Sequence, residues 1–128
     1  MVPKKIVVVD DEEVVRKTFF LILQKKYLVY LAEDSKEALR RFQNADIDLI
    51  IADLKLPDLN GLEMIAKFRE AGYKGEVIII SAYPDLINAE EFSNLSISHF
   101  FVKPLDLDAL NRTIDYLLNH KRNPAKIL

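Results

Sequence analysis

No cysteine occurs among the 128 residues of the sequence. Its absence excludes disulfides, thiol catalysis and cysteine-ligated metal sites. No apolar run approaches the roughly 20 residues that a membrane-spanning helix needs. A strong excess of positive charge is missing too, because 18 basic residues stand against 20 acidic ones and give a formal net charge of -2. The composition therefore does not favour a nucleic-acid-binding domain.

The N-terminal segment lacks the features of a secretory leader. Its apolar run, residues 6–9, ends at once in two aspartates, whereas a signal peptide needs a longer apolar stretch and a small-residue cleavage site. Hydrophobic residues make up 50% of the chain, which is enough for a packed core at this length. We therefore expect one soluble, cytoplasmic domain that contacts neither membrane nor nucleic acid directly.

Five short apolar runs alternate with longer amphipathic segments. The runs are rich in β-branched residues, which favour strands. They are continuous rather than alternating, which is typical of parallel strands covered on both faces. They comprise residues 6–9, 28–31, 49–52, 77–80 and 100–102.

The segments between these runs show helical spacing of apolar residues. The pattern predicts helices over residues 12–25, around 38–42 with Asp34 or Ser35 as N-cap, around 62–68 with Gly72 as the stop, and over 107–118 with Asp106 as N-cap. Residues 84–95 must form the fourth crossover, and we expect a short or mobile helix there. The alternation predicts an α/β fold, a (βα)5 doubly wound parallel sheet. Ligands of such sheets bind beyond the carboxyl ends of the strands.

Polar side chains follow four of the predicted strands directly. These are Asp10 and Asp11 after the first, Asp53 after the third, Ser81 after the fourth and Lys103 after the fifth. If the first, third and fourth strands are central, these groups meet at one edge of the sheet. Three close carboxylates repel one another unless a cation lies among them. A divalent ion that prefers oxygen ligands, such as Mg²⁺, suits that position.

These residue types suit transfer of a phosphoryl group to a carboxylate. A metal ion and Lys103 can stabilise the charge on the transferred group, and the hydroxyl of Ser81 can hold one of its oxygens. One carboxylate must attack as nucleophile and form an acyl phosphate. Asp53 is the best candidate because it stands alone at its strand end, whereas Asp10 and Asp11 are adjacent and better suited to hold metal.

Four motifs in this order resemble the receiver domain of two-component response regulators. They are Val7-Val8-Val9-Asp10-Asp11-Glu12, Asp53-Leu54-Lys55-Leu56-Pro57-Asp58-Leu59-Asn60-Gly61, Ser81-Ala82 and Phe100-Phe101-Val102-Lys103-Pro104. The resemblance extends from about Lys4 to about Leu118. It implies a flavodoxin-like sheet with strand order 2-1-3-4-5, a receiver domain over residues 1–120, and a tail or linker over residues 121–128.

The resemblance implies a role for each group at the site. Asp53 would accept the phosphoryl group. Asp11, Asp53 and the backbone carbonyl of Lys55 would bind Mg²⁺ (or Mn²⁺) directly, and Asp10 would act largely through a coordinated water. Lys103 would pair with the phosphoryl group. The donor would be a histidine kinase or a histidine phosphotransfer protein, and the output would go to a downstream effector domain or protein.

The resemblance also implies a switch, formed by Ser81 and Phe100. Once Asp53 is phosphorylated, Ser81 would move inward and Phe100 would fill the vacated space. This would change the face formed by the fourth helix, the fifth strand and the fifth helix, and would allow a phosphorylation-dependent homodimer there. Supporting residues are Pro57, Gly61, Ala82 and Pro104, with Pro104 after a cis peptide bond. Lys55 and Tyr83 flank the site at positions that tune phosphoryl lifetime in this family, and residues 96–99 replace its usual small Gly-Ala turn.

Three other functions fit the sequence less well. A haloacid-dehalogenase-type phosphatase needs a second aspartate two positions after its nucleophile on the first strand, where this chain has Glu12 or Glu13. A flavodoxin-like binding protein needs a phosphate loop where Asp10 and Asp11 would repel the phosphate. A receiver that is never phosphorylated would have lost one of the five polar residues. We therefore expect a signalling switch that does not turn over a separate substrate.

Overall fold

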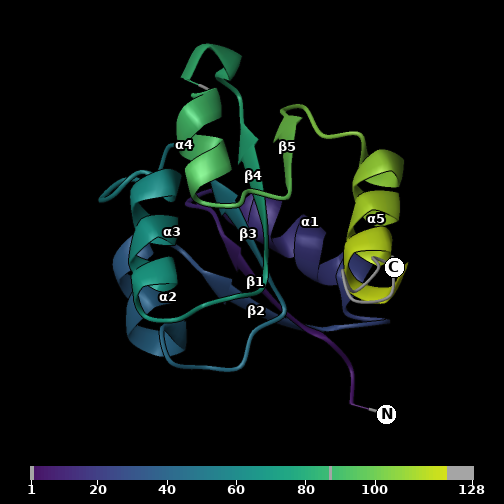
Figure 1. Cartoon of the computed structure of the whole chain (residues 1–128). Coiled ribbons are helices and arrows are strands. Elements are labelled where there is room, and N and C mark those ends of the chain that lie inside the picture. Colours follow the sequence, from purple (N-terminus) through teal and green to yellow (C-terminus); the bar gives the residue numbers. More distant parts are fainter. Residues whose placement is uncertain (1, 87, 121–128) are drawn as a thin grey trace, which may run out of the picture.

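The computed structural model describes residues 2–86 and 88–120 and contains one five-stranded parallel sheet with helices on both faces (Figure 1). The strand order is β2-β1-β3-β4-β5, and every neighbouring pair is parallel. This confirms the predicted fold and strand order. The strands are β1 (Lys5–Val9), β2 (Leu28–Ala32), β3 (Leu49–Asp53), β4 (Glu76–Ser81) and β5 (His99–Val102). The predicted tail, residues 121–128, lies outside the described residues.

The helices are close to those that the sequence predicts. They are α1 (Glu13–Leu23), α2 (Ser35–Phe42), α3 (Gly61–Glu70), α4 (Ala89–Asn94) and α5 (Leu107–Asp115), with a short 3-10 turn η1 (Pro84–Leu86) and a π-helical continuation of α5, η2 (Tyr116–His120). Of the two candidates for the cap of α2, Asp34 is the N-cap, since its side chain accepts the N–H of Glu37. The predicted cap Asp106 is confirmed, since it accepts the N–H of Ala109. Among residues 2–86 and 88–120, no helix is both long and apolar enough to cross a membrane.

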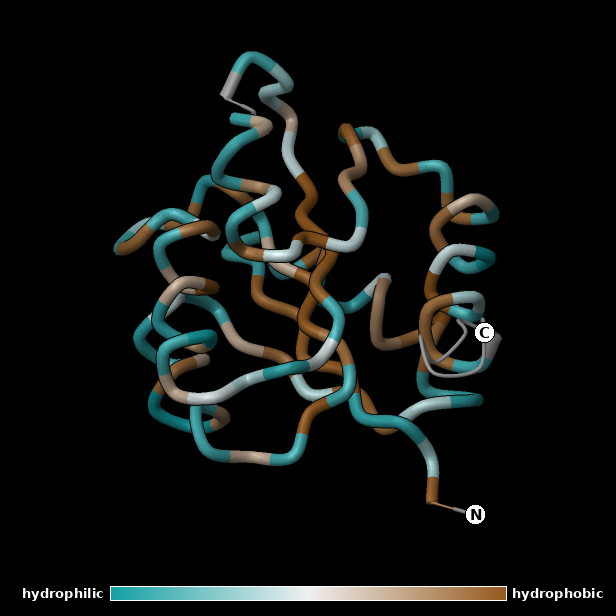
Figure 2. Tube along the Cα trace, viewed as in Figure 1, coloured by the Kyte–Doolittle hydropathy of each residue, from teal (hydrophilic) through white to brown (hydrophobic). Residues whose placement is uncertain are grey.

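Two hydrophobic clusters cover the two faces of the sheet. Side chains of α2 and α3 pack on one face, and side chains of α1 and α5 pack on the other. Figure 2 shows the hydrophobic colour concentrated along the central strands. These strands, β1, β3 and β4, are apolar on both sides because each side faces a helix layer. They form a rigid platform for the loops at their carboxyl ends.

The prediction that all five strands are covered on both faces is wrong for the two edge strands. Leu28 at the start of β2 is 40% exposed, and Val102 at the end of β5 is 45% exposed. An edge strand has a neighbour on one side only, and the helices cover the centre of the sheet better than its margins. The apolar runs of β2 and β5 look like buried strands in sequence although water reaches part of them.

Helix α4 is short, as predicted, and none of its residues is buried. At the corner that follows it, Ser96 adopts a positive φ of 55°. The N–H of Ser96 donates to the carbonyl of Ser93, and the N–H of Ile97 donates to the carbonyl of Phe92. This hydrogen-bond pattern is the usual glycine-terminated helix end, so a serine occupies a position that favours glycine.

Candidate active site at the carboxyl edge of the sheet

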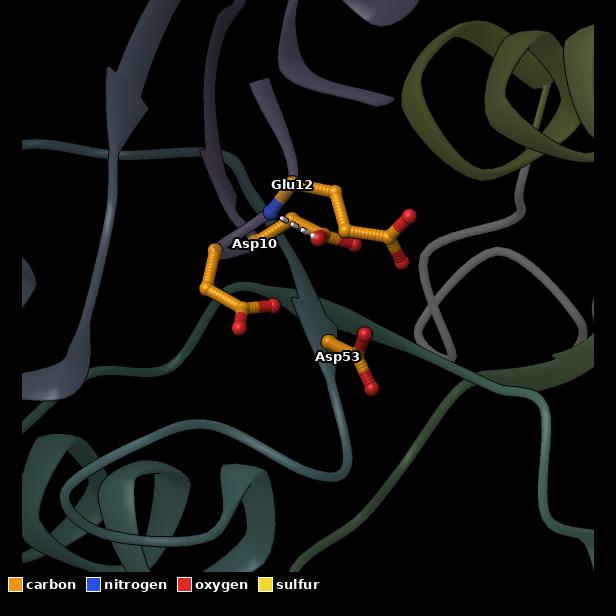
Figure 3. Close-up of side chains that lie close together, drawn as sticks. Asp10, Glu12 and Asp53 are labelled. Atoms are coloured by element: carbon orange, nitrogen blue, oxygen red, sulfur yellow. Dashed lines mark hydrogen bonds between the residues drawn. The ribbon is translucent and has the colours of Figure 1, made fainter. Parts of the chain in front are cut away.

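The structure brings the predicted polar residues together at the carboxyl ends of the strands. Asp10 follows β1, Asp53 ends β3, Ser81 ends β4, and Lys103 follows β5. Strands β1, β3 and β4 are adjacent in the sheet, so the loops that leave them converge. Figure 3 shows the carboxylates of Asp10, Glu12 and Asp53 close together at this edge.

The amine of Lys103 lies at the centre of the polar cluster. Its Nζ donates to Oδ2 of Asp53 at 2.8 Å, to Oε1 of Glu12 at 2.9 Å and to Oδ2 of Asp10 at 3.1 Å. Burial lowers the pKa of Lys103, but the hydrogen bonds to Asp53 and Glu12 and the charge of Asp10 outweigh burial, so that its pKa is raised. The lysine therefore stays protonated and holds the nucleophile candidate in place.

Asp10 is completely buried, which is unusual for a carboxylate. Its Oδ1 accepts the backbone N–H of Glu12 at 2.9 Å, the hydrogen bond drawn in Figure 3. Burial is the main reason that the pKa of Asp10 is raised to about 6, the charge of Asp53 adds to it, and the Glu12 N–H and Lys103 oppose it. Burial therefore disfavours the charged form of Asp10, and a cation nearby would offset this desolvation cost.

Four carboxylates can offer ligand atoms to one metal ion here. One oxygen each from Asp10, Asp11, Glu12 and Asp53 lie within 4.8 Å of one another. Hard oxygen ligands suit Mg²⁺, which also keeps several of its waters. The site opens into a cavity of about 370 Å³ whose lining includes Asp11, Asp53, Lys55 and Tyr83. The donor set and the open space both fit a hydrated divalent ion.

Glu12 was not predicted as a site residue. It stands at the N-cap of α1 and reaches back to Lys103. Its carboxylate is also part of the acidic group that could hold metal. The sequence signal was its place directly after Asp10 and Asp11, but a run of four acidic residues, 10–13, does not show which of them turn toward the site.

Backbone hydrogen bonds of the loop between β3 and α3 hold Asp53 in position. The N–H of Lys55 donates to Oδ1 of Asp53 at 3.0 Å, and the N–H of Gly61 donates to the carbonyl of Leu54 at 2.7 Å. A Cβ added to Gly61 would lie 2.4 Å from the backbone oxygen of Asp53. Glycine is therefore required at this position because the loop closes directly onto the strand end.

The two predicted switch residues lie on neighbouring strands. Ser81 is buried, and its Oγ accepts the N–H of Tyr83 at 2.9 Å. Phe100 is half-buried, and its ring packs edge-on against Phe92 of α4 with 5.7 Å between the ring centroids. The ring contact between Phe92 and Phe100 connects the fifth strand to the helix that has no buried residue.

Lys55 and Tyr83 face each other at the mouth of the cavity. The Nζ of Lys55 lies 4.8 Å from the centroid of the Tyr83 ring, a cation–π distance. Tyr83 is 50% exposed and lines the cavity. The N–H of Lys103 donates to the carbonyl of Ser81 at 2.8 Å, which joins the ends of β4 and β5. The peptide bond between Lys103 and Pro104 is cis, as the resemblance implied.

Comparison with known proteins gives a consistent result. The sequence model of the response regulator receiver domain matches residues 6–115. The chain is 28% identical over 97 residues to the Bacillus subtilis protein named sporulation initiation phosphotransferase F, covering 76% of this chain and 78% of that protein. It is 32% identical over 89 residues to the Escherichia coli transcriptional regulatory protein GlrR, covering 70% of this chain but only 20% of GlrR. The chain thus spans about a fifth of the length of that regulator.

Solved structures show the same fold. The Thermotoga maritima response regulator TrrA, in complex with Mg²⁺ and BeF, superimposes with a TM-score of 0.78 at 31% identity, covering 90% of this chain and 99% of that one. A CheY-like receiver domain protein from Methanospirillum hungatei gives a TM-score of 0.80 at 27% identity, covering 90% and 94%. The general function of such domains is a phosphorylation-dependent switch in two-component signalling. The chain belongs to the response regulator receiver domain family.

Proposed function

We propose that this chain is a phosphorylation-activated switch of a two-component system, in which Asp53 accepts a phosphoryl group from a histidine kinase or a histidine phosphotransfer protein. The observation that supports this most directly is the double restraint on the Asp53 carboxylate. Lys103 holds one oxygen and the Lys55 N–H holds the other, and both lie beside an open cavity. A carboxylate fixed in this way is oriented for attack.

Asp53 attacks phosphorus with one carboxylate oxygen. A P–O bond to Asp53 forms while the P–N bond to the donor imidazole breaks, and the imidazole leaves with the bonding electron pair and takes up a proton. Mg²⁺, held by Asp10, Asp11, Asp53 and the Lys55 carbonyl, would neutralise charge on the phosphoryl oxygens. The protonated amine of Lys103, which donates to the Asp53 carboxylate before transfer, would pair with the phosphoryl group after it.

The switch follows from the hydrogen bond that Ser81 makes before phosphorylation. Its Oγ accepts the Tyr83 N–H, so its own proton is available for an oxygen of phosphorylated Asp53. As the loop after β4 moves inward, the space beside β5 opens and Phe100 leaves its contact with Phe92. The α4-β5-α5 face then changes shape, which is a population shift driven by one modification. That face would bind the effector or form the homodimer.

The pair formed by Lys55 and Tyr83 is proposed to set the lifetime of the phosphoryl group. The exposed ring of Tyr83 lines the cavity and would hinder the water that hydrolyses the acyl phosphate. The chain would catalyse its own phosphorylation and slow hydrolysis and would not turn over a separate substrate.

The experiment is incubation with phosphoramidate, a small P–N donor, followed by treatment with hydroxylamine, which cleaves acyl phosphates. We expect a phosphoryl adduct that forms with Mg²⁺, is lost in hydroxylamine and is absent from Asp53→Asn. A hydroxylamine-resistant adduct would contradict an aspartyl phosphate. Asp48→Asn is the matched control, because Asp48 directly precedes β3, at the end of the strand away from Asp53. It should be phosphorylated normally.

A further inference from the structure

The tip of the loop between β3 and α3 is bonded to the start of α2. Oδ1 of Asp58 accepts the N–H of Ser35 at 3.0 Å, and Oδ2 accepts the N–H of Lys36 at 2.8 Å. In the opposite direction, the Oγ of Ser35 donates to the carbonyl of Leu59 at 3.0 Å. Three hydrogen bonds therefore join two segments that are more than 20 residues apart in sequence.

The start of α2 is a firm anchor for this loop. Ser35 is completely buried. The helix has its own N-cap, Asp34, whose side chain accepts the N–H of Glu37 at 2.8 Å. Asp58 accepts two other N–H groups of the first turn, which an isolated helix would leave to water. The charge of Asp58 is also favoured at this helix end. Burial raises the pKa of Asp58, but the N–H groups of Lys36 and Ser35 outweigh burial and lower it below its usual range.

The loop is held at its other points as well. Its base is closed by the hydrogen bond from Gly61 to Leu54, and the side chains of Leu54 and Leu56 are both buried in the cluster under α2 and α3. Lys55 lies between these two leucines, and its N–H orients Asp53. Asp58 fixes the remaining free part of the loop, beyond exposed Pro57.

We propose that Asp58 is a positioning residue for the phosphorylation site, acting through the loop that presents Lys55 to the metal ion and to Asp53. This inference rests on the proposed function. Mg²⁺ demands nearly ideal octahedral geometry, so a ligand on a loose loop binds it poorly. Partners that orient metal ligands typically change metal affinity about 10- to 100-fold.

The test is an amide NMR titration with MgCl₂ on the full chain, which reports both the dissociation constant and the integrity of the fold. Asp58→Ala should raise the dissociation constant of Mg²⁺ about tenfold, and Asp58→Asn, which keeps one acceptor oxygen, should lie between Asp58→Ala and the native chain. Asp34→Ala is the matched control, because it removes a cap from the same helix end without touching the loop. It should change the dissociation constant less than about twofold.

A second measurement separates positioning from a general structural effect. The rate of phosphorylation from phosphoramidate by Asp58→Ala should be reduced at low Mg²⁺ and should return to near the native rate at saturating Mg²⁺. A merely damaged fold would lower the rate at every Mg²⁺ concentration and would overturn the proposal. It is also overturned if Asp58→Ala binds Mg²⁺ as tightly as the native chain, or if Asp34→Ala weakens binding equally. If the native chain itself shows no Mg²⁺-dependent shifts, the proposed function fails, which is a distinct outcome.

Discussion

Asp10→Asn should stabilise the metal-free protein at neutral pH although it removes a hydrogen-bonded carboxylate. Asp10 is completely buried, and its pKa rises from 3.8 to about 6, chiefly because of burial. A raised carboxyl pKa means that the folded state binds a proton more tightly than the unfolded state. Stability is therefore lost as pH rises through this range, and the cost of the charge is complete above about pH 7.

The magnitude follows from the size of the shift. The pKa rises by roughly two units, and at about 1.4 kcal/mol for each unit the full cost is on the order of 3 kcal/mol. About 2 kcal/mol of that cost should develop between about pH 4.5 and about pH 7.5. Asparagine has no such charge. The free energy of unfolding of Asp10→Asn minus that of the native chain should therefore grow by about 2 kcal/mol as pH rises through this range. The contact with Lys103 lowers the pKa of Asp10 and is already included in its net rise, so its loss adds no separate contribution to this growth.

The assay is urea unfolding followed by far-UV circular dichroism in EDTA at several pH values. Asp106→Asn is the matched control, because Asp106 also accepts a backbone N–H but caps α5 outside the acidic cluster. Its stability difference should stay within about 0.5 kcal/mol across the same range. A difference for Asp10→Asn that is flat with pH, or that falls as pH rises, would show that burial does not destabilise this charge.

Three further changes test other parts of the structure. Gly61→Ala should lower the free energy of unfolding in urea by about 1–3 kcal/mol, because its Cβ would clash with the backbone oxygen of Asp53. It should also slow phosphorylation. Gly72→Ala, strained by a φ of 101° at the end of α3, should destabilise the chain without slowing phosphorylation; equal slowing in both would contradict a local effect. Tyr83→Ala should shorten the phosphoryl half-life, because the ring that hinders attack by water is removed, whereas Tyr116→Ala, also exposed, should not. A longer half-life in Tyr83→Ala would contradict the proposed shielding. Ser96→Gly should raise the free energy of unfolding by about 0.5–1 kcal/mol, because glycine adopts the positive φ of residue 96 without strain. Ser93→Gly within α4 should lower the free energy of unfolding by about 0.5 kcal/mol. A decrease for Ser96→Gly would show that the serine side chain stabilises this corner.

Most of the fold could be predicted from the sequence because local signals agree with the tertiary structure. The runs at 6–9, 49–52 and 77–80 are buried strands, since a doubly covered strand leaves an unbroken apolar pattern. Asp106 could be identified as a cap, and Asp34 as one of two candidates, because short side chains with an acceptor oxygen are preferred at the N-cap. The burial of β2 and β5 was overestimated because an apolar run does not show whether its strand has one neighbour or two.

Most residues of the site could be predicted from the sequence, but several of their contacts could not. Asp10, Asp53, Ser81 and Lys103 could be expected at one edge because parallel strands end together. The contribution of Glu12 and the bonds of Asp58 to α2 depend on the direction in which a side chain leaves a loop. No periodicity encodes that direction, so only the structure reveals them.

The most direct test of the account is intact-mass spectrometry after incubation with phosphoramidate, on the native chain with Mg²⁺, on the native chain with EDTA, and on Asp53→Asn with Mg²⁺. We expect a single phosphoryl adduct on the native chain with Mg²⁺ and no adduct in the other two samples. An adduct that persists in Asp53→Asn, or no adduct on a folded native chain, would contradict the assignment of Asp53 as the phosphoryl acceptor.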